Sequence, residues 1–232
     1  MSYRNLTVVA LVTLALLQGC GGGGSGSGTS VTPVTSFPLL AGYKSRIAAG
    51  ASDSYTISGT CAGNAAITSA AAIPATFEGV TGYSLAQTVT INVTNCTPAS
   101  NAVTATAYYD SNYSPIGSSI IGVEYTKFAT APPALPTSVK VGDTAVVATL
   151  TVYADSTKTA VTGQRVLSYV IESDTSTTAI ANLITKAYNS SGQLLFTAQS
   201  RFRIAADGAL TSMSIDIQYS TTSTNHIVFT KA

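Results

Sequence analysis

The chain has 232 residues, of which 9% are charged, and its formal net charge is +1. Ordinary soluble domains contain roughly 25% charged residues, so Ser, Thr, Asn and Gln must supply most of the polar surface here. A chain without a basic excess lacks the cations that neutralise a run of phosphates, which argues against nucleic acid as a partner. Its many β-branched residues favour strands over helices.

The N-terminal segment has the layout of an export signal. Arg4 lies in a short leading segment, and a run of twelve nearly all apolar residues, Leu6 to Leu17, follows it. A mature transmembrane helix needs about 20 apolar residues, so this shorter run is typical of the core of a signal peptide. The run ends in Leu17-Gln18-Gly19-Cys20, which resembles the lipobox of bacterial lipoproteins.

The lipobox resemblance implies a chemical modification and a location. In bacterial lipoproteins the cysteine sulfur receives a diacylglyceryl group, the signal peptide is cleaved before the cysteine, and the new amino group is acylated, commonly with palmitate. The resemblance therefore implies that residues 1–19 are removed and that Cys20 carries the lipid. Gly21 is not aspartate, the residue that often signals inner-membrane retention, so the resemblance implies the outer membrane, with its periplasmic or outer side left open. Two alternatives remain: an ordinary secretory signal and a membrane helix that is never cleaved.

Residues 20–36 follow as the lipidated cysteine and a tether rich in Gly and Ser. A flexible segment of this composition spans roughly 20–25 Å. Two or more acyl chains hold a protein at a membrane far better than one, at about 0.8 kcal/mol per buried methylene group. We expect the tether to hold the folded part of the protein away from the lipid head groups.

The two remaining cysteines, Cys61 and Cys96, predict a disulfide. An even number of cysteines in an exported protein usually forms a structural framework, whereas a redox pair would more often be Cys-x-x-Cys. His226 is the single histidine, so a zinc site would lack ligands. We expect neither a metal nor another cofactor.

A proline-rich segment, residues 131–138, predicts a linker between two modules. Pro132, Pro133 and Pro136 prevent a helix or a central strand from crossing this segment. Before it, residues 37–130 contain short runs in which apolar and polar residues alternate, as in strands buried on one face. These runs predict a small antiparallel β-sandwich, similar in outline to an immunoglobulin domain, that holds the disulfide.

After the linker, residues 139–232 predict an antiparallel meander of six strands. The alternation runs through residues 146–153, 167–171, 180–186, 196–204, 213–219 and 226–231, with turn residues between the runs. Short connections leave no room for the helical crossovers of parallel pairing. No segment has a sustained helical stripe, so the predicted fold class is all-β: a sandwich followed by a meander.

No arrangement of residues predicts catalysis. A Ser-His-Asp triad would have to use His226 near the chain end, and no serine lies in a Gly-x-Ser-x-Gly turn. Residues 110–114 imitate half of a calcium loop but lack the glycine and glutamate that such a loop requires, which favours a hairpin turn. Scattered carboxylates could meet in space as in a glycosidase, and the candidates are Glu78, Glu124, Glu172, Asp174 and Asp216.

Three tyrosines are candidates for a binding surface. Tyr108, Tyr109 and Tyr113 surround one turn of the first module. Exposed tyrosines supply large contact area at low entropic cost, as in many binding surfaces. Packing in the core would produce the same cluster, and both interpretations stay open.

Two arginines are candidates for an anion site. Arg201 and Arg203 share one face of a predicted strand, and Lys186 could lie on a neighbouring strand. Opposite charges that face each other across two strands stabilise a sheet. We therefore expect these arginines to pair with Glu172 or Asp216 on the solvated face.

Together these features predict a membrane-anchored lipoprotein of the cell envelope with a non-enzymatic binding or structural role. Its partners would be the membrane, through the N-terminal lipid, and a component of the envelope or of the extracellular space. One alternative is a carrier that holds an apolar ligand in a half-barrel formed by the C-terminal meander. The other is a secreted hydrolase that uses the scattered carboxylates.

Overall fold

The protein consists of antiparallel strands preceded by a short helix. The computed structural model describes residues 33–220 and 225–232. The helix is α2 (Leu39–Ala49). The strands are β1 (Ala51–Gly59), β2 (Gly63–Ser69), β3 (Ile73–Phe77), β4 (Val80–Val93), β5 (Ser100–Asp110), β6 (Pro115–Ile120), β7 (Glu124–Phe128), β8 (Thr144–Tyr153), β9 (Val161–Ser173), β10 (Thr178–Asn189), β11 (Leu194–Ala205), β12 (Leu210–Tyr219) and β13 (His226–Lys231).

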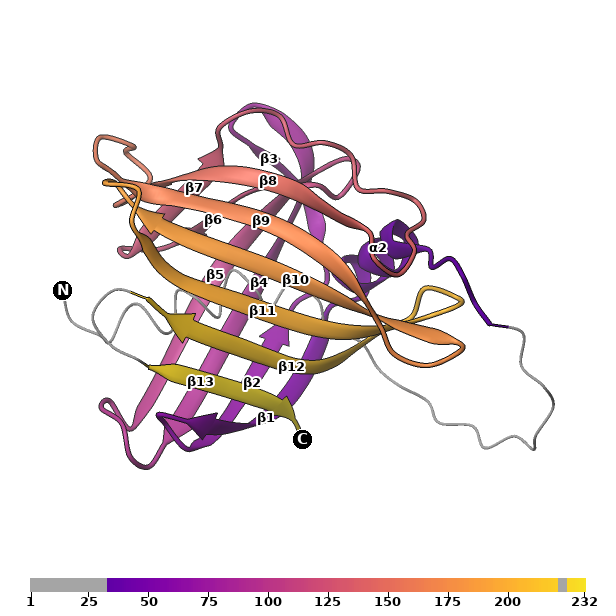
Figure 1. Ribbon diagram of the computed structural model, residues 1–232. Helices are drawn as coiled ribbons and strands as arrows, with labels where there is room; N and C mark the ends of the chain where they lie inside the picture. Colours follow the sequence, from indigo (N-terminus) through magenta and orange to yellow (C-terminus); the bar gives the residue numbers. More distant parts are fainter. Residues whose placement is uncertain (1–32, 221–224) are drawn as a thin grey trace.

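The strands close into a single barrel (Figure 1). β1, the first strand, pairs with β2 on one side and with β13, the last strand, on the other. β2 also pairs with β4, and from β4 onward each strand pairs with the next as far as β13. These pairings make a closed ring of 12 antiparallel strands. β3 is an additional strand that pairs with β4 beside β2.

The predicted division into two modules is wrong. β7 and β8 flank the proline-rich segment, and they pair with each other, with Tyr125 opposite Tyr153. β1 and β13 belong to different predicted modules and also pair, with Tyr55 opposite Lys231. The prolines interrupt the strand pattern locally, but the strands on either side of a loop can still be neighbours in one sheet. Residues 131–138 therefore belong to a loop within a single fold.

The predicted six-stranded meander is present, because β8 to β13 pair consecutively. It forms one wall of the barrel and not a separate module. In Figure 1 this wall lies in front, and the strands of the N-terminal half form the wall behind it and run across it at a steep angle. The sandwich predicted for residues 37–130 does not form, because its strands complete the rear wall of the shared barrel.

Apolar side chains fill the barrel from both walls. Alternate residues point inward along each strand, so that Tyr55 and Ile57 of β1 are buried whereas Thr56 between them is exposed. Val89 of the rear wall and Ala198 of the front wall belong to one apolar cluster, and both are 0% exposed. The interior of a barrel widens with the number of strands. Buried apolar side chains from both walls therefore line the wide interior of this barrel.

Helix α2 fills the space at one end of the barrel. The ring of Tyr43 packs edge-on against Tyr109 of β5, with ring centroids 6.2 Å apart. Gly42 lies against the turn after β11, where an added Cβ would lie 2.0 Å from the carbonyl oxygen of Gly208. The sequence analysis expected no helix here, because the buried face contains a glycine and an arginine among its apolar residues. That face consists of Leu39, Gly42, Tyr43, Arg46 and Ile47.

A buried ion network fastens the helix to the barrel. Arg46 donates a hydrogen bond from Nη1 to the carbonyl oxygen of Leu210 at 2.9 Å, and its Nη2 lies 3.6 Å from Oδ2 of Asp53. Asp53 also forms an ion pair with Lys231 of β13. Burial lowers the pKa of Arg46 to about 9, and the nearby carboxylate of Asp53 opposes that shift, so the guanidinium stays protonated at neutral pH.

The predicted disulfide between Cys61 and Cys96 is present. It joins the β1–β2 connection to the β4–β5 connection. Asn95 holds the same corner, because its Oδ1 accepts a hydrogen bond from the Ala62 amide at 2.6 Å and its Nδ2 donates to the Thr60 carbonyl at 3.2 Å. The disulfide therefore ties together two loops that already touch.

Replacement of both cysteines tests the contribution of this crosslink. The two cysteines are 35 positions apart, and a loop of that length predicts that Cys61→Ala/Cys96→Ala lowers the free energy of unfolding by about 3 to 4 kcal/mol. Urea unfolding under oxidising conditions measures the difference. An equal loss for the wild-type chain after reduction is expected, and a double variant as stable as the oxidised protein would contradict the assignment.

Asp53→Asn tests the buried network. The change leaves Arg46 and Lys231 without their carboxylate in the interior, and a broken buried pair costs roughly 3 kcal/mol or more. Asp207→Asn is the matched control, since Asp207 accepts one hydrogen bond from the Ala209 amide in an exposed turn, which asparagine can replace. Equal urea midpoints for the two variants would show that the network does not fasten the helix.

Candidate functional site

The three tyrosines predicted as a binding surface do not share one face. Tyr109 is 1% exposed and lies in the core. Tyr108 lies on the outer side of β5, where its ring stacks on Phe77 with centroids 4.1 Å apart. Tyr113 stacks on Tyr83 at 4.6 Å. Core packing, the other interpretation, accounts for Tyr109, whereas the other two rings pack on separate partners.

The turn between β5 and β6 is a hairpin turn, as predicted. Oδ1 of Asp110 accepts hydrogen bonds from the amides of Asn112 at 2.8 Å and Ser114 at 2.9 Å. These bonds occupy the carboxylate within its own turn. Among residues 33–220 and 225–232, no group of three or more His, Cys, Asp or Glu side chains is arranged to hold a metal ion.

The carboxylates considered for catalysis all have structural partners. Five of the ten acidic residues form ion pairs with Lys or Arg side chains: Asp53, Glu78, Glu124, Glu172 and Asp174. Asp216 lies 2.9 Å from the imidazole of His226. The other four accept backbone hydrogen bonds in turns: Asp110, Asp143, Asp155 and Asp207. The five predicted candidates are spread over five different contacts and do not converge on one another.

The two candidate arginines are also paired. Nε of Arg201 lies 3.4 Å from Oε2 of Glu172, which confirms the cross-strand pair. Arg203 binds Asp174 and not Asp216, which instead lies 2.9 Å from the imidazole of His226.

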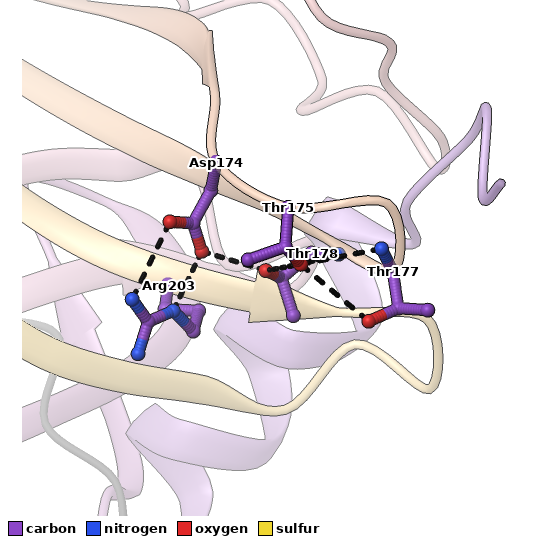
Figure 2. A network of polar contacts seen from close by, with 5 residues as sticks. All are labelled: Asp174, Thr175, Thr177, Thr178 and Arg203. Carbon is purple, nitrogen blue, oxygen red and sulfur yellow. Dashed lines mark hydrogen bonds and ion pairs between the residues drawn. The ribbon is translucent and has the colours of Figure 1, made fainter. Parts of the chain in front are cut away.

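Asp174 organises the end of the β9–β10 hairpin (Figure 2). Arg203 donates from Nε to Oδ2 of Asp174 at 2.6 Å, and the hydroxyl of Thr178 donates to the same oxygen at 2.6 Å. These two bonds lower the pKa of Asp174, the bond from Arg203 contributing most. Thr175 and Thr177 extend the contacts around the turn. Nε and Nη2 of Arg203 on β11 are therefore bound to the Asp174 carboxylate at the hairpin, and 45% of the arginine side chain is exposed.

A second polar cluster lies beside the β3–β4 hairpin. Glu78, at the tip of this hairpin, accepts hydrogen bonds from the Tyr125 hydroxyl at 2.6 Å, from Lys127 at 2.9 Å and from Lys158 at 2.8 Å. These bonds lower the pKa of Glu78 to about 2, and the bond from Lys158 has the largest effect. Phe77 packs beside it on Tyr125, with ring centroids 5.4 Å apart. The hairpin is thereby fixed against the outer side of the barrel.

An open cleft lies on the outer side of the front wall, where β9 begins and β10 ends. Its volume is about 490 Å³. Tyr188 and Gln164 stand opposite each other on the paired strands, and their chain neighbours Ala187 and Arg165 are buried. The lining residues are Val161, Gly163, Gln164, Val166, Tyr188, Asn189, Ser190 and Gly192.

Two backbone features lie beside this cleft. The pairing of β10 with β11 shifts by one residue between Ala187 and Tyr188, and such a bulge redirects the side chains beside it. At Gly163 an added Cβ would lie 2.0 Å from the carbonyl oxygen of Tyr188, so the floor of the cleft is backbone. Asn189 fixes the adjoining turn, because its Oδ1 accepts hydrogen bonds from the amides of Ser191 and Gln193.

No feature predicted from the sequence corresponds to this cleft. The sequence predicts the turn that follows Tyr188 but no role for Tyr188 itself. The available signal was Gly163, a glycine inside a run of strand residues, which often marks a close approach of two backbones. Nothing in the alternation pattern placed that glycine opposite Tyr188.

Comparison of the chain with family models, with curated proteins and with solved structures finds no match. Within residues 33–220 and 225–232, no helix has the length and apolar character needed to cross a bilayer.

Glu78→Gln tests the hairpin contact through its pH dependence. The folded-state pKa of Glu78, about 2, lies below the ordinary value of 4.5, so the carboxylate stabilises the fold above pH 4.5 and loses that contribution as the pH falls toward 2. At pH 7 we expect the variant to be less stable by about 1 kcal/mol in urea unfolding, because two partly exposed ion pairs are lost.

The difference between the wild-type protein and Glu78→Gln should shrink between pH 4.5 and pH 2. Lys158→Met removes one partner and should reproduce part of the loss at pH 7. A stability difference that stays constant over this pH range would contradict the role assigned to the Glu78 carboxylate.

Proposed function

We propose that the protein is a membrane-anchored lipoprotein of the cell envelope with a non-enzymatic binding or structural role. The observation that carries the proposal is the sequence Leu17-Gln18-Gly19-Cys20 at the end of a short apolar run. Cys20 itself lies outside the described residues. An acylated cysteine followed by a Gly- and Ser-rich tether suits a folded domain held beside a membrane.

The start of the described chain supports this arrangement. The amide of Val34 donates a hydrogen bond to the carbonyl of Ser176 at 2.8 Å, and Phe37 forms a β-bridge with Val139. Both contacts lie at the end of the barrel that α2 fills (Figure 1). A lipid-anchored chain would therefore enter the fold at this end and leave the opposite end of the front wall pointing away from the membrane.

The outward face of β1 supports a position in water. Outward positions of β1 are occupied by Ser52, Ser54 and Thr56, whereas its inward positions include Tyr55 and Ile57. A strand with polar outward side chains suits an aqueous environment such as the periplasm or the cell exterior.

All ten acidic side chains already have a partner within the fold, which supports a binding or structural role over hydrolysis. Burial raises the pKa of the Glu124 carboxyl group. This side chain lies inside the barrel in an ion pair with Arg165. A general acid of a hydrolase needs access to its substrate. The hydrolase alternative would have to break one of these contacts before a carboxylate could act.

The carrier alternative depended on a half-barrel, and that structure is not formed. The C-terminal strands do not enclose a separate space, because β13 pairs with β1 and β8 pairs with β7. Their inward residues are buried inside the barrel, as Ala198 is in the apolar cluster that also contains Val89. The apolar face proposed as a lipid site is the core of the protein.

Cys20→Ser tests the proposal. We expect the variant to keep its signal segment and lack acyl mass, whereas the wild-type chain should be found with membranes at the mass of a chain that starts at Cys20 and carries the lipid. Intact-mass measurement of the membrane and soluble fractions gives both results. Gly19→Ala keeps a small residue before the cysteine and should behave as the wild type. Equal masses and equal fractionation for Cys20→Ser and the wild type would overturn the proposal.

A further inference from the structure

We propose that the cleft at the β9–β10 hairpin binds a neutral, hydroxyl-rich saccharide. The inference rests on the binding role proposed above and adds the site and the class of ligand. It comes from the shape of the cleft, the chemistry of its lining and its position on the barrel.

The shape suits a small ligand. The volume, about 490 Å³, lies within the range of roughly 300–1,000 Å³ that small-molecule sites occupy. Asn189 holds the turn at its edge through three hydrogen bonds, to the amides of Ser191 and Gln193 and to Oε1 of Gln193. A cleft that is already formed saves the cost of ordering its loop when a ligand binds.

The lining favours a neutral ligand with both apolar and hydroxyl surfaces. None of the lining side chains carries a charge. Tyr188 is half-buried and lines the cleft together with Val166, and a sugar ring presents a face of C–H groups that can pack on an aromatic ring. Gln164 and Ser190 are exposed at the edges, where sugar hydroxyls could both donate and accept hydrogen bonds.

The polar groups of the cleft are available. Within the described part of the chain, the side chains of Gln164, Tyr188 and Ser190 make no hydrogen bond to another residue. Asn189 differs, because its amide is occupied in the turn. The site thus combines a fixed frame with three free polar groups. Lys186, the next outward residue on β10, is the nearest cation along that strand and is not part of the lining.

The position suits contact with material beyond the membrane. The cleft lies at the end of β10, whereas the N-terminal segment contacts Ser176 just before its start. Those points lie at opposite ends of the front wall in Figure 1, separated by the 12 residues of β10, or roughly 40 Å of strand. A lipid anchor at the N-terminal end would turn the cleft away from the bilayer.

The test is a titration of the full chain, produced in a bacterial envelope and extracted in a polyoxyethylene detergent, since glycosidic detergents would compete. N-acetylchitotetraose and maltotetraose are the neutral probes, and they distinguish a β-linked, N-acetylated source from an α-glucan. A hyaluronan tetrasaccharide is the acidic probe. Saturation-transfer NMR detects contact, and calorimetry gives Kd.

The variants separate the cleft from the rest of the surface. Tyr188→Ala removes the ring and should weaken binding of the neutral probe by about tenfold, and Gln164→Ala should weaken it by about fivefold. Tyr188→Phe keeps the ring and removes only the hydroxyl, so it should weaken binding of the neutral probe by about two- to fivefold. Thr56→Ala, at an exposed outward position of β1, is the control and should leave Kd unchanged, because β13, β12 and β11 separate β1 from β10. Urea midpoints establish that each variant is folded.

Saturable binding of a neutral probe with this order of effects supports the inference. It is overturned if neither neutral probe binds at 10 mM, or if binding survives in both Tyr188→Ala and Gln164→Ala. Binding of the acidic probe alone, lost in Lys186→Ala, would overturn the neutral class of ligand. The titration does not depend on the anchor, and Cys20→Ser should bind like the wild type, so a failure here and a failure of lipidation are separate results.

Discussion

A barrel of 12 strands must fill its interior, and this constraint determines most of the structure. Eight strands enclose a space that their own side chains can fill, but additional strands widen it. This protein fills the extra space in two ways. Buried apolar residues of both walls, such as Val89 and Ala198, form one cluster, and α2 packs with residues of both walls in a second cluster. Filling the barrel with a helix brings Arg46 into the interior, and Asp53 and Lys231 from the strands that close the barrel supply its charge partners.

A filled interior moves any binding function to the outer surface. The larger inward side chains serve the core, so a ligand must use the outward residues, the loops or the edges of the hairpins. On that outer surface most charged groups are already paired, as Arg203 is with Asp174 and Glu78 is with two lysines. The cleft beside Tyr188 differs because its polar groups are uncharged and its backbone is held in place. The chain has few charged residues overall, and the lining of the candidate site has none.

The sequence predicts the local features of this protein better than its long-range ones. Alternation identifies the strands of the front wall, and the even pair of cysteines predicts Cys61–Cys96. Alternation gives the wrong buried face for β10, where Ile180 and Ile184 lie on the outer face and Ala179 and Ala187 are buried. Alternation cannot identify partners, because the inward residues of β1 would suit many neighbouring strands, and its pairing with β13 joins opposite ends of the chain. The helix was missed since Gly42 and Arg46 interrupt its apolar face. The cleft lies beside a one-residue shift at Tyr188, and alternation does not predict that shift or the approach of Gly163 to Tyr188.

Closure of the barrel by β1 and β13 is the central claim, and native-state hydrogen exchange tests it most directly. The two strands pair over five positions, from Tyr55 opposite Lys231 to Gly59 opposite Ile227. In a closed barrel their buried amides should exchange only through global unfolding, with the same protection as the amides of β9 to β11 in the middle of the front wall. Rapid exchange in β1 and β13, beside strong protection in β9 to β11, would mean that the two halves of the chain fold separately and would contradict the account.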